Sequence, residues 1–137
     1  MRNARYSLLA AVMLHCLIAA AKANIGETQD QIAARYGSGK VSEFTMGYRN
    51  SAAFAYTTDG YEITVIFRAG KSIAEMYDHK GVEVPEAEIK EALKVYSVGH
   101  SWKSSNNDRW WRADKKMEAH RVDQRKDCYV ISWMTTM

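Results

Sequence analysis

The residues best suited to catalysis or metal binding are His100, His120 and Cys128, all in the second half of the chain. Zinc sites take ligands in closely spaced pairs, such as Cys-x-x-Cys or His-x-x-x-His, because one structural element then fixes two ligands. No such pair occurs among these residues, and neither His79 nor Asp127 supplies one. The sequence therefore predicts no metal site and no cofactor.

A nucleophilic mechanism would place Cys128, or a serine such as Ser101, beside His100 or His120 as the base. No glycine elbow surrounds a serine, and a catalytic triad is recognised by a geometry that spacing alone does not give. We therefore expect no catalytic residue and no enzyme activity. A small secreted hydrolase or metal-dependent enzyme built on His100, His120 and Cys128 is the alternative.

Gly70-Lys71-Ser72 has the ending of a phosphate-binding loop. That motif needs an earlier glycine, where this chain has Val65, and it needs a helix directly afterwards. The residues after Ser72 read as a strand instead. We interpret the segment as a hairpin turn.

Adjacent tryptophans at 110 and 111 give the clearest sign of a binding surface. Successive side chains of a strand face opposite ways, so the two rings cannot enter the same core. An outward tryptophan beside arginines is typical of protein interfaces. We therefore expect a binding surface drawn from Trp110, Trp111, Arg109, Arg112 and Arg121.

Three alternatives to an open surface remain at this point. The connection 38–51, a second half of the same fold, or a dimer partner would each cover the sheet face. Carbohydrate binding through an exposed tryptophan also stays open, and the oligomeric state is unknown.

Two helices and two groups of strands must position these residues. Thr28 and Gln31 have the spacing of a capping box, which predicts a first helix over about 28–36. Ile89, Ala92, Leu93 and Tyr96 recur at spacings of three and four, which predicts a second helix over about 85–96.

Strands are predicted where the hydrophobic period changes to two. Residues 61–67 alternate in this way, with turn residues on both sides, so 53–57 and 72–77 become hairpin partners. Strand-like runs also occupy 109–113, 117–122 and 128–133, and 103–108 reads as a polar loop.

The order of elements indicates an internal repeat, because a slide of 56 residues lays 54–77 over 110–133 without a gap. We expect an α+β fold of two helix-plus-three-stranded-meander units, with one antiparallel sheet and both helices on one face. The chain would then be a single compact domain over 24–137, with repeats at 24–80 and 81–137.

Residues 1–23 have the order of a secretory signal peptide. Arg2 and Arg5 precede an apolar stretch, and Ala21-Lys22-Ala23 supplies small residues at the cleavage positions. We expect a mature start at Asn24 and a periplasmic or secreted protein. The apolar stretch is shorter than the about 20 residues that cross a bilayer, so we expect no membrane span after cleavage.

The formal charge of +3 comes from this leader, since its Arg2, Arg5 and Lys22 account for the whole excess. A neutral domain offers no basic surface of the kind that nucleic acids require, and we expect no nucleic-acid partner. Cys16 leaves with the leader, so Cys128 has no intramolecular disulfide partner. It opens an apolar run, so burial is expected; an intermolecular disulfide is the alternative.

Two motifs carry a family resemblance. The pattern GET-x-x-QI-x-ARYG opening at Gly26, and GKS-x-x-E-x-Y opening at Gly70, are similar to those of small exported proteins of Verrucomicrobia-like bacteria. That resemblance implies export but brings no site residues with it.

At the level of architecture, the repeated helix and meander is similar to the tandem modules of beta-lactamase inhibitory protein and to the SmpA/OmlA outer-membrane assembly lipoproteins. That resemblance implies a protein-binding role. The chain departs from the lipoproteins by lacking a lipidation motif, and from the inhibitor by lacking a cysteine pair in each module. We expect an exported, non-catalytic binding or scaffold module that engages a protein or cell-envelope component.

Overall fold

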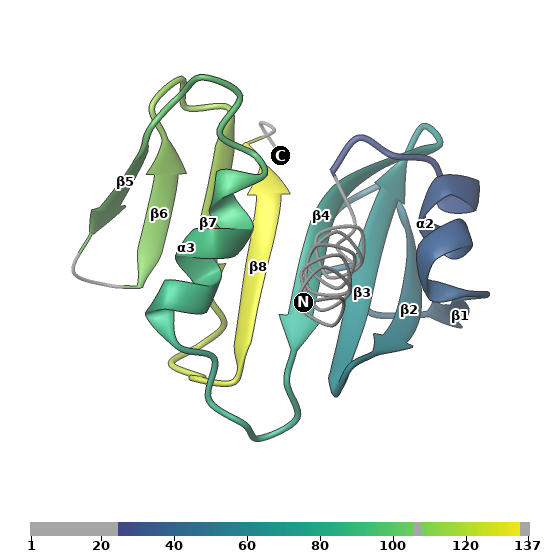
Figure 1. Ribbon diagram of the computed structural model, residues 1–137. Helices are drawn as coiled ribbons and strands as arrows, with labels where there is room; N and C mark the ends of the chain where they lie inside the picture. The colour runs from purple at the N-terminus through teal and green to yellow at the C-terminus, as the bar shows by residue number, and fades with distance from the viewer. Residues whose placement is uncertain (1–24, 106–107, 135–137) are drawn as a thin grey trace, which may run out of the picture.

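The computed structural model describes residues 25–105 and 108–134, so the predicted leader and its cleavage site lie outside the described residues. Eight strands within them form one antiparallel sheet in the order β1-β2-β3-β4-β8-β7-β6-β5, and two helices accompany it (Figure 1). The fold is α+β and is dominated by the sheet. The elements are α2 (Gln29–Tyr36), β1 (Lys40–Ser42), β2 (Ala52–Thr58), β3 (Tyr61–Arg68), β4 (Lys71–Asp78), α3 (Glu86–Lys94), β5 (Trp102–Ser105), β6 (Arg109–Arg112), β7 (Met117–Arg121) and β8 (Cys128–Trp133).

The predicted capping box starts α2. The Gln31 amide donates to the Thr28 hydroxyl at 3.3 Å, and the Thr28 amide donates to the Gln31 side chain at 2.9 Å. Each bond satisfies an amide that has no partner inside the helix. Gly37, with a φ of 84°, follows the last helical residue, where a positive φ suits glycine.

The strands around β3 also form where the sequence places them. The turn between β2 and β3 is Asp59-Gly60, and both residues have positive φ, as a tight hairpin turn requires. Ile63, Val65 and Phe67 of β3 are buried in the main core, which confirms the predicted core face of this strand.

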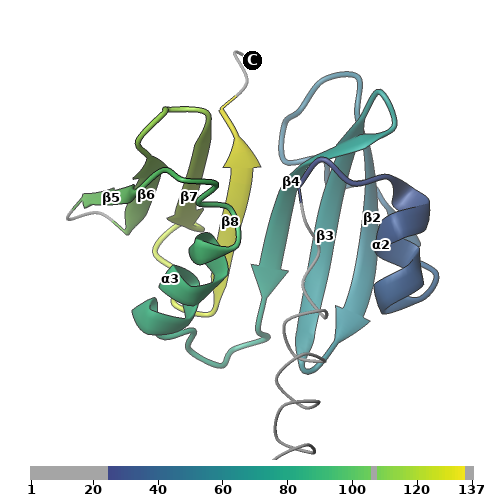
Figure 2. The same ribbon diagram turned by 45° about the horizontal axis from the view of Figure 1, so that its top comes forward.

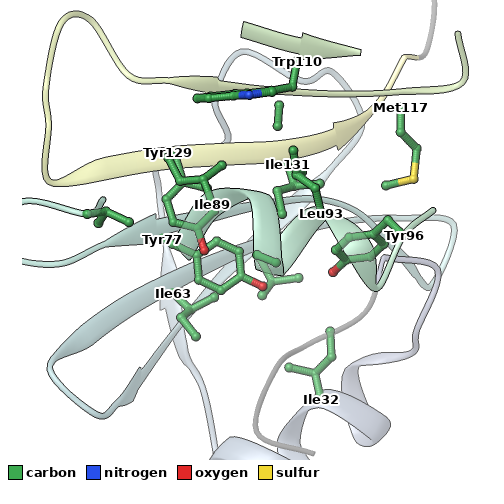
Figure 3. Packing of buried hydrophobic residues seen from close by; sticks show 14 of the residues in the cluster. Ile32, Ile63, Tyr77, Ile89, Leu93, Tyr96, Trp110, Met117, Tyr129 and Ile131 are labelled. Atoms are coloured by element: carbon green, nitrogen blue, oxygen red, sulfur yellow. The ribbon is translucent and has the colours of Figure 1, made fainter. Parts of the chain in front are cut away.

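Both helices cover the same face of the sheet, which we call the helix face (Figures 1 and 2). Ile32 of α2 and Ile89 and Leu93 of α3 are buried there against residues from both halves of the sheet (Figure 3). The helix-face members of the sheet include Ile63, Tyr77, Trp110, Met117, Tyr129 and Ile131. A single core therefore joins β2–β4 to β6–β8.

The predicted three-stranded meanders are wrong in strand number. β1 lies in the connection 38–51, and β5 occupies the first half of the predicted polar loop 103–108. Both are short strands at the outer edges of the sheet. In the part of the chain that the structure describes, no helix is long and apolar enough to cross a membrane.

Candidate binding surface

The candidate surface lies on the sheet face turned away from the helices, which we call the far face. Two rows of directly paired residues cross it from edge to edge. The first is Ser105, Arg109, His120, Val130, Met76, Thr64, Ala55 and Lys40, and the second is Lys103, Trp111, Glu118, Ser132, Ala74, Ile66, Ala53 and Ser42. Paired residues have Cβ atoms about 4.5–5.5 Å apart, so each row forms a continuous strip of side chains.

The loop 43–51 covers the part of the far face that β2–β4 form. Met46 and Tyr48 pack against Ala53, Ile66 and Ala74 in a second apolar cluster. Ile66 is therefore fully buried, although the alternation in the sequence placed it on an outward face. One predicted alternative, in which the connection 38–51 covers the sheet, holds for this half of the far face.

Arg68 fixes the same loop from the end of β3. Its guanidinium lies 5.8 Å from the centre of the Tyr48 ring and donates to the carbonyl oxygen of Arg49 at 2.8 Å. The Ser51 hydroxyl donates to the Tyr48 carbonyl at 2.7 Å. These contacts fix the loop in place, so it forms a wall on the far face.

Between this wall and the side chains of β6 and β7 lies a cavity of about 460 Å³, which we call the far-face groove. Met76 and Val130 pair across β4 and β8 and form its apolar floor. On the loop side Phe44 is 56% exposed. The lining residues are Phe44, Met46, Tyr48, Met76, Arg109, Glu118, His120, Val122, Asp123, Val130 and Ser132.

His120 lines this groove, and one nitrogen of its ring lacks a partner. Its Nδ1 atom is buried and has no hydrogen-bond partner. Burial lowers the pKa of His120, Arg109 lowers it further, and Glu118 and Asp123 oppose the change. The ring is therefore neutral at pH 7, when one nitrogen donates and the other accepts.

Only part of the predicted binding surface lies on the far face. Arg109 and Trp111 lie on the far face; Arg109 is exposed and lines the groove, and Trp111 is partly exposed. Trp110 points to the helix face and is only 3% exposed. The predicted opposition of the two tryptophans is thus what the structure shows, with Trp110 as the inward ring.

Arg112 does not lie on the surface where it was expected. It is buried on the helix face, where it donates to both Asp114 oxygens at 2.8 Å and to the Tyr96 carbonyl at 2.8 Å. Its guanidinium holds the pKa of Asp114 at about 2. Arg112 shares the inward parity of Trp110, two residues earlier, so β6 cannot turn it outward.

Arg121 is also engaged inside the molecule. Its side chain is 8% exposed and donates to the carbonyl oxygens of Val84 and Lys126 at 2.8 and 2.9 Å. These bonds tie the segment before α3 to the turn between β7 and β8. Arg121 therefore stabilises the fold at this end of β7 and does not belong to the open surface that the sequence predicted.

The residues of the enzyme alternative do not converge. Trp102 pairs with Arg112 at one end of β6, and His120 pairs with Arg109 at the other, so His100 and His120 lie toward opposite ends of that strand. His100 is exposed and lies 3.7 Å from Asp114.

Cys128 is fully buried, as predicted, and burial raises the pKa of its thiol to about 11. That change disfavours the thiolate that a nucleophile needs. Among residues 25–105 and 108–134, no group of three or more His, Cys, Asp or Glu is arranged to hold a metal ion.

A buried carboxylate that the sequence analysis did not single out lies on the helix face. Glu75 is fully buried between Val65 and Ile131 and accepts hydrogen bonds from the hydroxyls of Tyr77 and Tyr96. Its Oε1 atom has no partner. Burial raises the pKa of Glu75 to about 7, although the two tyrosine hydrogen bonds lower it.

The groove residues of the loop had a visible signal in the sequence. Phe44, Met46 and Tyr48 are large apolar residues in an otherwise polar connection, which indicates that the connection folds back onto an apolar surface.

Comparisons of this chain with protein-family models, with curated proteins and with solved structures find no match.

Proposed function

We propose that this protein is a non-catalytic binding module that holds an extended segment of another protein in the far-face groove. The groove carries the proposal because it combines an apolar floor with a polar rim on one face of the sheet. Its lining runs along β7 from Glu118 and on to Val122, the residue after the strand, a rise of about 13 Å at the spacing of strand residues. That length suits about four residues of an extended peptide.

The chemistry of the lining supports a protein partner. Met76 and Val130 offer an apolar anchor site, and Phe44 exposes a ring beside it. Arg109, Glu118 and Asp123 offer charges of both signs around the lining. An apolar centre with a polar rim is the usual anatomy of a protein interface.

The predicted leader at 1–23 makes this partner a component of the cell envelope or of the surroundings of the cell. The duplicated architecture belongs to the same proposal. A shift of 56 residues carries Tyr61 at the start of β3 onto Met117 at the start of β7, and the same shift superposes most of α2 and α3 in sequence. We infer two helix-plus-sheet units whose last strands, β4 and β8, meet at the centre of the sheet.

Site-specific photo-crosslinking in cells tests the proposal. We would place a benzophenone amino acid at Phe44 in the groove and, as a control, at Val98, which is 77% exposed outside it. The expected result is a discrete protein adduct from position 44 that position 98 does not give. Adding Met76→Glu, which puts a charge into the groove floor, should remove that adduct.

Equal adducts from both positions, or an adduct that survives Met76→Glu, would overturn the proposal. Absence of any protein adduct at position 44, combined with a glycan-dependent change in Trp111 fluorescence, would replace the protein partner with a carbohydrate. Circular dichroism of each variant confirms that the sheet is intact.

A further inference from the structure

A second cavity, of about 350 Å³, lies between α3 and the strands β5 and β6, on the helix face. Its wall on the helix consists of Lys90, Leu93, Lys94 and Ser97, which follow one another at helical spacings on one side of α3 and just beyond it. We call this cavity the α3–β5 cleft. It is separate from the far-face groove because the sheet lies between them.

The strand side of the cleft is formed by Trp102, Ser104 and Trp110. Ser104 pairs directly with Trp110, and Trp102 lies two residues before Ser104 on the same face of β5. Trp110 stands at one margin of the core cluster (Figure 3). The two indoles and Leu93 therefore provide apolar surface inside the cleft.

Both indoles have an unsatisfied donor. The Nε1 atoms of Trp102 and Trp110 are buried and have no hydrogen-bond partner, and Trp110 as a whole is only 3% exposed. An indole N–H can only donate. Buried polar groups in folded proteins nearly always have a partner. These two nitrogens have almost no accessible surface, so a ligand in the cleft would contact the faces and edges of the rings before it could reach the N–H groups.

The polar side chains that line the cleft favour an anionic ligand. Lys90 and Lys94 present ammonium groups, which only donate, and the Ser104 hydroxyl can donate as well. Among the described residues that line the cleft, none carries a carboxylate. The lining is thus rich in donors and positive in charge.

Neither lysine is committed to a strong partner. Lys90 pairs with Glu86 at 3.2 Å and Lys94 with Glu91 at 2.6 Å, and in both pairs each side chain is more than half exposed. Exposed pairs of this kind contribute little to stability. Both ammonium groups can therefore turn toward a ligand at small cost.

We infer that the α3–β5 cleft binds a small organic carboxylate, with the anionic oxygens toward the two lysines and Ser104 and an apolar body against Leu93 and the indole rings. The volume is at the low end of small-molecule sites, which suits a ligand of about the size of benzoate. Charge-assisted hydrogen bonds to a carboxylate are stronger than neutral ones, so the charge should decide the affinity.

Titration of ¹⁵N-labelled protein with benzoate tests this inference, and benzamide serves as a neutral ligand of the same shape. The four tryptophans give four indole N–H signals, which Trp102→Phe and Trp111→Phe help to assign. Benzoate should shift the Trp102 and Trp110 signals saturably, with smaller changes at Trp111 and Trp133. Benzamide should have little effect.

Paired charge variants complete the test without disturbing the core. Lys90→Gln with Lys94→Gln should weaken benzoate binding about tenfold, corresponding to 1.4 kcal/mol. Lys40→Gln with Lys71→Gln, which removes two exposed lysines from the other half of the sheet, should leave the affinity within about twofold.

Three results would overturn the inference. Benzamide could bind as well as benzoate, the Lys90 and Lys94 variant could bind benzoate as the wild type does, or no saturable shift could occur up to about 10 mM benzoate. None of these results depends on a partner in the far-face groove.

Discussion

Trp110 and Trp111 occupy opposite faces of β6, so two adjacent residues of one type have different surroundings. Trp110 is 3% exposed in the core beneath α3, and Trp111 is partly exposed on the far face beside Glu118. Since the Trp110 ring packs in the core and the Trp111 ring faces outward, substitution of Trp110 should mainly change stability and substitution of Trp111 should mainly change binding.

We predict that Trp110→Ala lowers the free energy of unfolding by about 3–5 kcal/mol, because it leaves a large cavity in the core. Trp111→Ala should change it by only about 1 kcal/mol. It should also weaken the adduct expected at the far-face groove, because Trp111 pairs with Glu118, which lines that groove. Urea denaturation gives both free energies. If the two substitutions destabilise the protein equally, the far face is not a free surface at Trp111.

Arg112 and Arg109 give a second matched pair, one buried and one exposed on the same strand. Arg112→Met should lower the free energy of unfolding, because it removes the guanidinium that donates to Asp114 and to the Tyr96 carbonyl, and that carbonyl would lose its partner. Arg112→Lys should not restore stability, since an ammonium cannot reproduce the two parallel hydrogen bonds.

Arg109→Met should change the same free energy by less than about 0.5 kcal/mol. Thermal denaturation followed by circular dichroism compares the three variants. Equal loss for Arg109→Met and Arg112→Met would contradict the structural role of Arg112.

The sequence predicts local features of this fold well. The alternation in β3, the Asp59-Gly60 turn and the capping box at Thr28 act over a few residues, so their signals are visible in the chain itself. All three features are present in the structure.

The outer strands could not be predicted in the same way. β1 and β5 contain three and four residues, too few to show a period. The conformation of β1 depends on pairing with residues distant in sequence, such as Lys40 with Ala55. The conformation of β5 depends on its hairpin with β6. Strand formation at such positions is set by tertiary context.

Only part of the candidate surface could be predicted, for a related reason. The alternation rule separated Trp110 from Trp111, and the same rule places Arg112 with Trp110 rather than with Arg109. Grouping the arginines by charge overlooked that parity. The groove itself depends on the fold of loop 43–51 over the sheet, which no local pattern specifies.

The capping box offers a prediction about α2. Thr28→Ala removes the acceptor for the Gln31 amide and should lower the free energy of unfolding by about 1 kcal/mol. Thr28→Ser keeps the hydroxyl and should retain most of that stability. Urea denaturation of the two variants measures the difference, and equal midpoints for alanine and serine would show that the cap does not stabilise the fold.

Glu75 predicts how the stability of the whole domain depends on pH. Burial raises its pKa from 4.5 to about 7 in the folded protein, so between these values the folded state holds a proton that the unfolded state has released. Linkage then requires the free energy of unfolding to fall as the pH rises through this range. The loss attributable to Glu75 should reach about 3 kcal/mol by pH 8.

Glu75→Gln should remove this part of the pH dependence, because a glutamine stays neutral and can still accept hydrogen bonds from the hydroxyls of Tyr77 and Tyr96. The difference in free energy of unfolding between the two proteins, measured from pH 4.5 to 8, isolates Glu75 because the other titrating groups are common to both. Tyr77→Phe removes a hydrogen bond that lowers the pKa of Glu75, so in that protein the decline should extend to higher pH. A difference between wild type and Glu75→Gln that stays constant over the whole range would show that this carboxyl group ionises at its ordinary pKa in the folded protein.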